Sequence, residues 1–216
     1  IVNANNTTYK YTPVNNETLT VVATFAGNDW YHSNASAPEE FDVNRIATSI
    51  NVAVINNPVT YGNAAVIAVT MDPTINATVK VKVNGKYYDV AVVNGEGKLN
   101  VSGLNADSYG VNVTYAGDDR YAPSINDTVS FTVVPADLTA EVIGLNVTVS
   151  DNTKFIINVT DDFKGNVRIT DEDGKVLYDG AVKAIVDGAI VPTAGDKKVT
   201  AVFYGDANYN RLVIDN

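Results

Sequence analysis

The stretch TYAGDDRY at residues 114–121 decides the fold of this chain, because it occurs in three copies. The other two copies read TFAGNDWY at residues 24–31 and VFYGDANY at residues 202–209. Successive copies place their central glycines 90 and 88 residues apart, at Gly27, Gly117 and Gly205. A recurrence at this spacing indicates repeated modules of about 90 residues, which is the size of a small β-sandwich.

The composition and the alternation of residues both predict an all-β protein. The 216 residues are rich in Val, Ile, Thr and Tyr, the residue types that suit a pleated and half-buried surface. Residues 78–83 (TVKVKV) alternate valine with lysine, and Asn84-Gly85 then separates them from KYYDVAVV. Alternating residues on both sides of Asn-Gly predict a β-hairpin. Short strands with turn signals every 8–12 residues predict antiparallel sandwiches, and no segment has the pattern of a helix.

The repeat divides the chain into three predicted domains. Residues 1–43 hold only the C-terminal half of a module, residues 44–134 form a module that Pro135 ends, and residues 135–216 form another without a visible closing strand. Within them we expect, among others, one strand over residues 19–25 and a short strand over residues 145–149. The chain begins at Ile1 without methionine, so we expect a processed product or a segment of a longer protein.

The motif resembles the bacterial-type immunoglobulin-like domains that large surface proteins carry in tandem. It is most similar to the adhesin-like proteins of methanogenic archaea, also in the FDV and FTV triplets at Phe41 and Phe131 and the NGKYY hairpin. The resemblance implies tandem immunoglobulin-like sandwiches in a non-enzymatic, extracellular stalk or adhesin at a cell surface. Its expected partners are adjacent repeats or neighbouring copies, and host or cell-wall glycans are further candidates. Two alternatives remain open: a filament subunit assembled by strand exchange between chains, and a polysaccharide-binding module.

A structural role explains the motif better than a chemical one, since a scaffold feature recurs in every module. Glycine permits a positive φ, the acidic residue hydrogen-bonds its own turn, and the tyrosine ring packs on the core while its hydroxyl reaches backbone, as in a tyrosine corner. We expect the neighbouring Trp30 to be buried at an edge or against the next module rather than free to stack on a sugar. The predicted structural residues are Gly27, Tyr31, Gly117, Asp118, Tyr121, Gly205, Asp206 and Tyr209.

Acceptor sequences for N-glycosylation (Asn-x-Ser/Thr) are more frequent than composition alone predicts. Alternatively, strands with valine inward and polar residues outward produce Asn-Val-Ser or Asn-Val-Thr without any glycan. Both interpretations place these side chains at the surface. The ten sites are Asn5, Asn6, Asn16, Asn34, Asn76, Asn100, Asn112, Asn126, Asn146 and Asn158.

Charge and residue content exclude several other classes of function. A net charge of −10 disfavours nucleic acid, and no apolar run approaches the roughly 18 residues that span a bilayer. Without cysteine and with His32 as the only histidine, the chain lacks common zinc sites and the usual catalytic triads, so we predict neither catalysis nor a cofactor. Calcium is an alternative at the acidic pairs and triplet at residues 118–119, 161–162 and 171–173, although turn chemistry explains these more simply.

Overall fold

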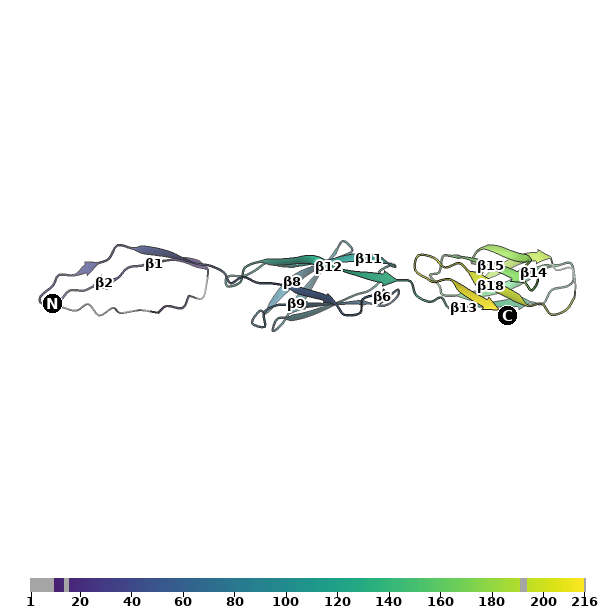
Figure 1. The fold of residues 1–216 in the computed structure, drawn as a ribbon, viewed down its shortest axis with the longest axis horizontal. Helices are drawn as coiled ribbons and strands as arrows, with labels where there is room; N and C mark the ends of the chain where they lie inside the picture. The colour runs from purple at the N-terminus through teal and green to yellow at the C-terminus, as the bar shows by residue number, and fades with distance from the viewer. Residues whose placement is uncertain (1–9, 14–15, 191–193, 216) are drawn as a thin grey trace. The chain divides into compact units, whose positions relative to one another are not determined.

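The computed structural model describes residues 10–13, 16–190 and 194–215, and within them the chain is all-β, with nineteen strands and no helix (Figure 1). Contacts between Cα atoms separate it into two compact units. The first unit comprises Ile1–Ala53, Ala68–Lys98 and Val111–Val129, and the second comprises Val54–Ile67, Leu99–Gly110 and Ser130–Asn216. No helix in the described part of the chain is both long and apolar enough to cross a membrane.

The first described strands form a two-stranded ribbon, a name that we use for residues 16–43. Strand β1 (Glu17–Val21) pairs antiparallel with β4 (Glu39–Val43), and β2 (Thr24–Phe25) pairs with β3 (Asn34–Ala35). The single strand expected over residues 19–25 is wrong, because it is interrupted between β1 and β2. There the Ala23 N–H donates to the Ser36 hydroxyl, and the Ser36 N–H donates back to the Ala23 carbonyl.

The middle sandwich consists of eight strands in two sheets. One sheet has the order β10-β7-β5 and the other has the order β6-β12-β11-β8-β9. This arrangement is that of an immunoglobulin-like sandwich, with successive strands distributed over two layers by Greek-key connections. The strands are β5 (Asn51–Val54), β6 (Val59–Thr60), β7 (Ala65–Thr70), β8 (Ala77–Val83), β9 (Lys86–Val92), β10 (Glu96–Val101), β11 (Asp107–Tyr115) and β12 (Ser124–Val134).

The predicted Asn-Gly hairpin is confirmed between β8 and β9. Val83 faces Lys86 in the register, and both residues between them have a positive φ, 47° at Asn84 and 74° at Gly85. The three inward valines of β8 are fully buried, as the alternation predicted, whereas the two lysines between them are exposed. Local turn chemistry and strand alternation therefore determine the register of this hairpin together.

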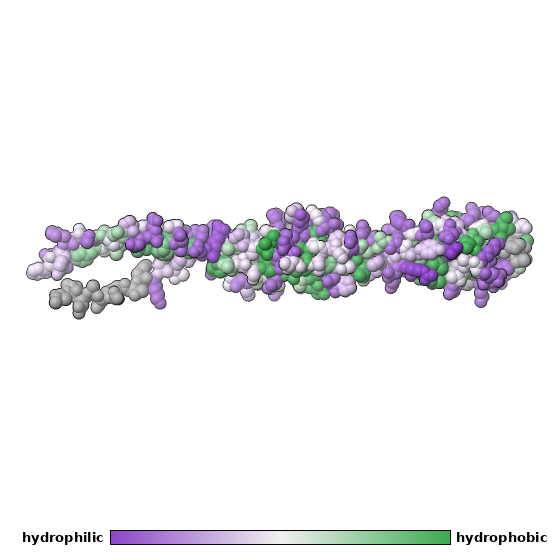
Figure 2. Space-filling model, turned by 45° about the horizontal axis from the view of Figure 1, so that its top comes forward, coloured by the Kyte–Doolittle hydropathy of each residue, from purple (hydrophilic) through white to green (hydrophobic). Residues whose placement is uncertain are grey.

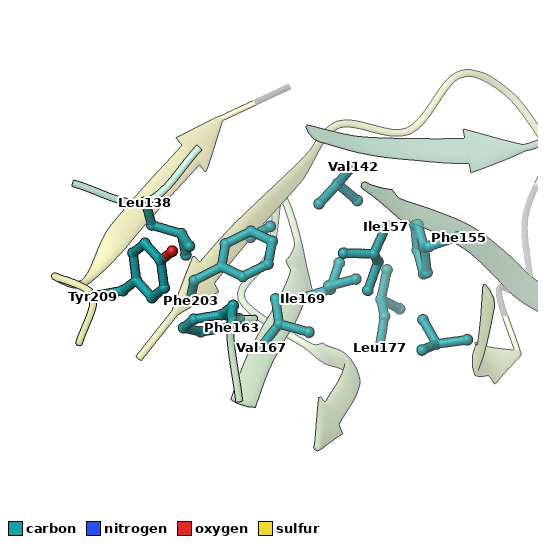
Figure 3. Close-up of a cluster of buried hydrophobic side chains, with 12 residues drawn as sticks. Leu138, Val142, Phe155, Ile157, Phe163, Val167, Ile169, Leu177, Phe203 and Tyr209 are labelled. Carbon is teal, nitrogen blue, oxygen red and sulfur yellow. The ribbon is translucent and has the colours of Figure 1, made fainter. Parts of the chain in front are cut away.

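The C-terminal sandwich lies within the second unit and again has two sheets, with the orders β13-β14-β17 and β16-β15-β18-β19. Its core packs Phe155, Val167, Ile169 and Phe203 between the sheets (Figure 3). The strands are β13 (Ala140–Leu145), β14 (Asn152–Val159), β15 (Asn166–Asp171), β16 (Val176–Ala181), β17 (Ile185–Ile190), β18 (Val199–Phe203) and β19 (Leu212–Asp215).

One predicted strand of this sandwich is wrong. The segment expected to be extended over residues 145–149 leaves the sheet after Leu145, where β13 ends. A turn follows, with a hydrogen bond from the Asp151 N–H to the Thr148 carbonyl and a φ of 76° at Ser150. Apolar residues at alternate positions favoured a strand, but this turn between β13 and β14 takes precedence over their β propensity.

Candidate interaction site: the repeated corner and the ribbon

The second copy of the motif forms a tight corner after β11. Gly117 has a φ of 79°, and a Cβ there would lie 2.7 Å from the Tyr121 carbonyl oxygen. Asp118 Oδ1 accepts hydrogen bonds from the N–H groups of Arg120 at 2.8 Å and Tyr121 at 2.7 Å, and its Oδ2 accepts the Tyr115 hydroxyl at 2.8 Å. These bonds, first that from the Tyr121 backbone, lower the pKa of Asp118. Burial, followed by the bond to Asp118, raises the pKa of Tyr115 to about 12.

The first copy forms the same corner with an amide in place of the carboxylate. Asn28 Oδ1 accepts the N–H groups of Trp30 at 2.9 Å and Tyr31 at 2.8 Å, and Gly27 has a φ of 87°. An uncharged oxygen therefore suffices for the turn. The turn needs only a side-chain oxygen that accepts the N–H groups of the second and third residues after it.

The third copy repeats the arrangement within the C-terminal sandwich. Asp206 Oδ1 accepts the N–H groups of Asn208 at 2.8 Å and Tyr209 at 3.0 Å, and Gly205 has a φ of 79°. A backbone bond closes the loop: the Asp206 N–H donates to the Tyr209 carbonyl at 3.0 Å, and the equivalent bond is present in the other two copies. All three copies thus share one local structure.

Two of the corners also bind the segment with which their own sandwich begins. The Ile46 N–H donates to the Arg120 carbonyl at 2.9 Å, and the Ile46 carbonyl accepts the Ala122 N–H at 2.8 Å, which forms a parallel bridge between Ile46 and Tyr121. Ala136 makes the equivalent bridge to Tyr209. The motif is therefore a docking point for a parallel strand, in addition to a turn.

The tyrosine hydroxyls of these corners contact side chains, and the prediction that they reach backbone is wrong. The Tyr121 hydroxyl lies 2.6 Å from Thr74 Oγ1, and the Tyr209 hydroxyl donates to Asp162 Oδ1 at 2.6 Å. Sequence reasoning missed both partners. A usable signal existed, because Thr74 and Asp162 are 88 residues apart, as are Tyr121 and Tyr209.

A different residue occupies the tyrosine corner of the middle sandwich. Tyr109 lies near the start of β11, and its hydroxyl donates to the Asn105 carbonyl at 3.0 Å. A tyrosine near the start of this strand, bonded to backbone a few residues upstream, is the immunoglobulin tyrosine corner. The role that the sequence assigned to Tyr121 therefore belongs to Tyr109, which also packs its ring against Phe131.

Asp162 joins two tyrosines within the second compact unit. Its Oδ2 accepts the Tyr61 hydroxyl at 2.6 Å, while Tyr61 and Tyr209 pack edge to face with ring centroids 5.3 Å apart. The two hydrogen bonds, first that from Tyr209, lower the pKa of Asp162. The hydrogen bond to Asp162 raises the pKa of Tyr61. The equivalent bond, followed by burial, raises the pKa of Tyr209 to about 12.

The loops of the second and third corners also accept a hydrogen bond from a segment one repeat earlier. In the first compact unit the Asn16 N–H donates to the Asp119 carbonyl at 3.1 Å. In the second unit the Ala106 N–H donates to Asn208 Oδ1 at 2.8 Å. Asn16 and Ala106 are 90 residues apart and precede β1 and β11, so the donors occupy equivalent positions, whereas one acceptor is a backbone carbonyl and the other is a side-chain oxygen.

The ribbon differs from the middle sandwich in the burial of its apolar residues. Phe41 is 46% exposed, whereas its counterpart Phe131, 90 residues further on, is 2% exposed. Hydrophobic residues are visible along the surface of the ribbon in the space-filling view (Figure 2). The same contrast holds for Val21 and Val111, at 53% and 1%, for Phe25 and Tyr115, at 48% and 3%, and for Tyr31 and Tyr121, at 58% and 7%.

Trp30 is 87% exposed, so the expectation that it is buried is wrong for this chain. It stands between Asp29 and Tyr31 at the tip of the first corner, and its own N–H donates to the Asn28 side-chain oxygen. His32 is exposed beside it.

The predicted glycosylation sites are distributed over all three regions. Asn126 and Asn112 are half-buried, and the amide nitrogen of Asn126 donates to the Ile50 carbonyl at 2.9 Å. Asn5 and Asn6 lie outside the described residues. The exposed sites are Asn16, Asn34, Asn76, Asn100, Asn146 and Asn158.

Each acidic cluster has one carboxylate engaged in hydrogen bonds, which are local turn bonds at Asp118 and Asp171 and bonds to two tyrosine hydroxyls at Asp162. Asp118 and Asp162 accept the hydrogen bonds given above, and Asp171 Oδ1 accepts the N–H groups of Asp173 and Lys175 at 3.1 and 2.8 Å. Among residues 10–13, 16–190 and 194–215, no group of three or more His, Cys, Asp or Glu side chains is arranged to hold a metal ion. The predictions on calcium, on cofactors and on the domain limits stay predictions.

No family model and no curated protein matches the chain. Solved structures match it at low identity. Dimeric latent PorU from Porphyromonas gingivalis is 14% identical over 78% of this chain, with a TM-score of 0.30, and the chain spans only 20% of its length.

A 1.5-MDa bacterial ice-binding adhesin is 21% identical, with 92% of this chain and 71% of that chain covered and a TM-score of 0.38. The fibronectin(III)-like modules of Clostridium thermocellum CbhA are 12% identical, with 76% and 92% covered and a TM-score of 0.30. These similarities are too weak to carry function. The structure itself defines the chain as a repeat segment of immunoglobulin-like β-sandwiches.

Proposed function

We propose that this chain is a non-enzymatic segment of an extracellular repeat protein, a stalk or adhesin of the adhesin-like type found in methanogenic archaea. The recurring corner supports this proposal most directly. The second and third copies each bind the first segment of their own sandwich and a residue one repeat earlier. A connection that recurs with the repeat suits a chain that transmits tension or displays a surface, and does not by itself form a catalytic cleft.

The extracellular setting draws its support from composition. Eight described glycosylation acceptors are exposed or half-buried, none is fully buried, and the net charge of −10 favours solubility at an exposed surface. We expect intact cells of the source organism to expose the chain to antibody, and some of the acceptor asparagines to carry glycans by mass spectrometry. Labelling confined to permeabilised cells would contradict this setting.

Single-molecule stretching tests the mechanical part of the proposal. Two sandwiches of about 90 residues each should rupture in separate events, and each should release roughly 30 nm of chain, since an extended residue spans about 3.3–3.6 Å. We expect two such events and no comparable third event from the ribbon. A single event that releases the whole chain at low force would contradict a role in carrying tension.

Polysaccharide binding is a second candidate, and the exposure of Trp30 favours it, because a free indole can stack on a sugar ring. A glycan array probed with the chain and with Trp30→Ala tests it. Binding that is lost in the variant would support a sugar site at the corner, whereas an array without signal would remove this candidate.

A further inference from the structure

A groove opens in the C-terminal sandwich where the connection from β16 to β17 crosses from one sheet to the other. It has a volume of about 760 Å³, within the size range of small-ligand sites. Three segments bound it: the end of β14 from Ile157 onward, the loop that begins at Thr160, and the connection over residues 181–184. Ile157 and Phe163, which both line the groove, belong to the buried core in Figure 3.

The middle sandwich fills the equivalent position with its own chain. Its three-residue connection from β9 to β10 ends in Asn94-Gly95, with φ values of 51° and 77°. The Met71 N–H donates to the Gly95 carbonyl at 2.8 Å, and the Gly95 N–H donates to the Ile75 carbonyl at 3.0 Å. A Cβ on Gly95 would lie 2.7 Å from the Met71 carbonyl oxygen, so this close approach requires glycine.

The C-terminal sandwich has Lys183-Ala184 in place of the Asn-Gly pair, 89 residues further on, and neither residue has a positive φ. The Ala184 carbonyl accepts the Ile157 N–H at 3.0 Å. The counterpart of Met71, however, is Val159, 88 residues further on. The connection therefore meets β14 two residues earlier than in the middle sandwich, which leaves the end of β14 beside the groove.

Val159 directs its backbone into this groove. The Thr160 N–H bonds the segment that leads into β13, while Ile157 bonds toward β17. Because successive residues of a paired strand present their N–H and C=O groups to alternating edges, those of Val159 point to the β17 side. There the Val182 N–H donates to the Gly165 carbonyl instead of continuing the ladder.

The charge of the groove also differs from that of its counterpart. In the middle sandwich the Asn94 N–H donates to Asn76 Oδ1 at 2.8 Å. The equivalent residues of the C-terminal sandwich are Lys183 and Lys164, which both line the groove, and neither forms an ion pair with the described residues. Asp161 lines it as well, so the groove has an excess of one positive charge in a chain of net charge −10. This exchange of amides for lysines favours an anionic ligand.

We propose that the groove binds the C-terminal carboxylate of a peptide whose last side chain is apolar. The Val159 N–H, Lys164 and Lys183 donate hydrogen bonds to the carboxylate, and the apolar side chain packs on Val159 and Val182 at the margin of the core. Because the chain bounds the groove on three sides, a terminus fits it better than a strand that runs through, and the positive charge selects the carboxylate end. The proposal does not depend on the adhesin or stalk function.

Titration of the full chain with the peptide acetyl-Gly-Ala-Val, followed by amide chemical shifts in NMR, tests this proposal. We expect saturable shifts in residues 157–165 and 181–184 and none in β5–β12. The same peptide with an amidated C-terminus should bind at least roughly tenfold more weakly, because hydrogen bonds to a charged group are lost. Octanoate and glucuronate, which carry a carboxylate without peptide groups, should also bind more weakly than the free peptide.

Variants of the full chain locate the site. Lys164→Gln and Lys183→Gln should each weaken binding of the free peptide by at least about threefold, whereas Lys154→Gln, outside the groove, should leave it unchanged. The double variant Lys183→Asn with Ala184→Gly restores the pair found in the middle sandwich. It should fold the turn into the groove, slow the exchange of the Val159 amide and abolish binding.

Three results would overturn the proposal. Equal affinity for the free and the amidated peptide would show that the carboxylate is not recognised. Octanoate or glucuronate that binds as tightly as the peptide would show that the ligand is not a peptide. Shifts absent from residues 157–165 and 181–184, or unchanged in the double variant, would show that the groove is not the site.

Discussion

The first and second copies of the motif have the same corner and opposite surroundings. Asn28 and Asp118 each accept the backbone N–H groups two and three residues further on, and the equivalent distances agree within 0.1 Å. Yet Tyr31 is exposed and Tyr121 is buried. The comparison shows that the corner forms from its own residues, whereas the core around it requires strands from elsewhere. A set of paired substitutions tests this separation.

The largest effect is expected at the aromatic residues of the FTV and FDV triplets. Phe131→Ala should destabilise the middle sandwich by about 3–5 kcal/mol, because it removes a buried ring and leaves a cavity in its place. Phe41→Ala should change the unfolding of the chain by less than about 0.5 kcal/mol, as exposed substitutions do. Urea unfolding followed by near-ultraviolet circular dichroism measures both. A comparable loss for the two variants would show that the ribbon has a core of its own.

A somewhat smaller effect is expected at the glycines. Gly117→Ala places a Cβ against the Tyr121 carbonyl at a φ of 79°, and should destabilise the middle sandwich by roughly 1–3 kcal/mol. Gly27→Ala creates the same clash in the ribbon, where the Cβ would lie 3.0 Å from the Tyr31 carbonyl oxygen.

Hydrogen exchange distinguishes the two glycine variants. Gly27→Ala should speed exchange around residues 28–31 and leave β5–β12 unchanged, whereas Gly117→Ala should speed exchange throughout the middle sandwich. Gly62→Ala is a useful control, since its φ is also positive but no atom lies within 4 Å of the added Cβ. If Gly117→Ala behaves like Gly62→Ala, the close approach to Tyr121 contributes nothing beyond the backbone conformation.

The tyrosine hydroxyls should show a third, smaller difference. Tyr121→Phe removes the hydrogen bond to Thr74 and should reduce stability by about 0.5–1.5 kcal/mol. Tyr31→Phe should have no measurable effect on unfolding, because its ring is largely exposed. A double-mutant cycle of Tyr121→Phe with Thr74→Val measures the coupling, and a coupling energy of zero would mean that the contact does not stabilise the fold.

The pH dependence should provide the most local signal. Tyr209 has its pKa raised from 10.0 to about 12, so its contribution to stability is complete below pH 10 and is lost as the pH rises through 12. The pKa of Asp162 is lowered from 3.8, so its contribution is present above about pH 4 and is lost as the pH falls below that value.

Absorbance of tyrosinate against pH checks the alkaline limb. Tyr115 and Tyr209 should titrate last, and Tyr115→Phe and Tyr209→Phe should each remove one phenol from the step near pH 12. Asp162→Asn should lower the pKa of Tyr209, because it removes the negative charge while an acceptor oxygen remains. An unchanged alkaline step in this variant would contradict the assigned cause.

Much of the fold followed from periodicity and turn residues. Alternation predicted which valines of β8 face inward, and Asn84-Gly85 predicted the hairpin, because both signals act within a few residues. The prediction of a strand over residues 145–149 was wrong because the end of a sheet is not set by local residues alone. These residues favoured extension, but a turn between β13 and β14 replaced the strand, and a single sequence does not state where a sheet ends.

The candidate site was predictable only in part. The residues of the corner were identified from the triple repeat, but their partners Thr74, Asp162 and Ile46 were not, since each comes from a distant part of the chain. The tyrosine corner was assigned to Tyr121 although Tyr109 forms it. Tyr109 lies near the start of β11 and Tyr121 follows its end, and the hydrogen bond from the Tyr109 hydroxyl to the Asn105 carbonyl shows which of the two forms the corner.

The sequence by itself determined the corner: a glycine, an Asx acceptor and the two N–H donors that follow form the same turn in all three copies. Those interactions lie within eight residues and need no tertiary support. Only the tertiary structure decided that Tyr121 and Tyr209 are buried while Tyr31 and Trp30 are exposed. Burial depends on strands that are tens of residues away in the sequence, and the identical local motif carries no record of whether those strands are present.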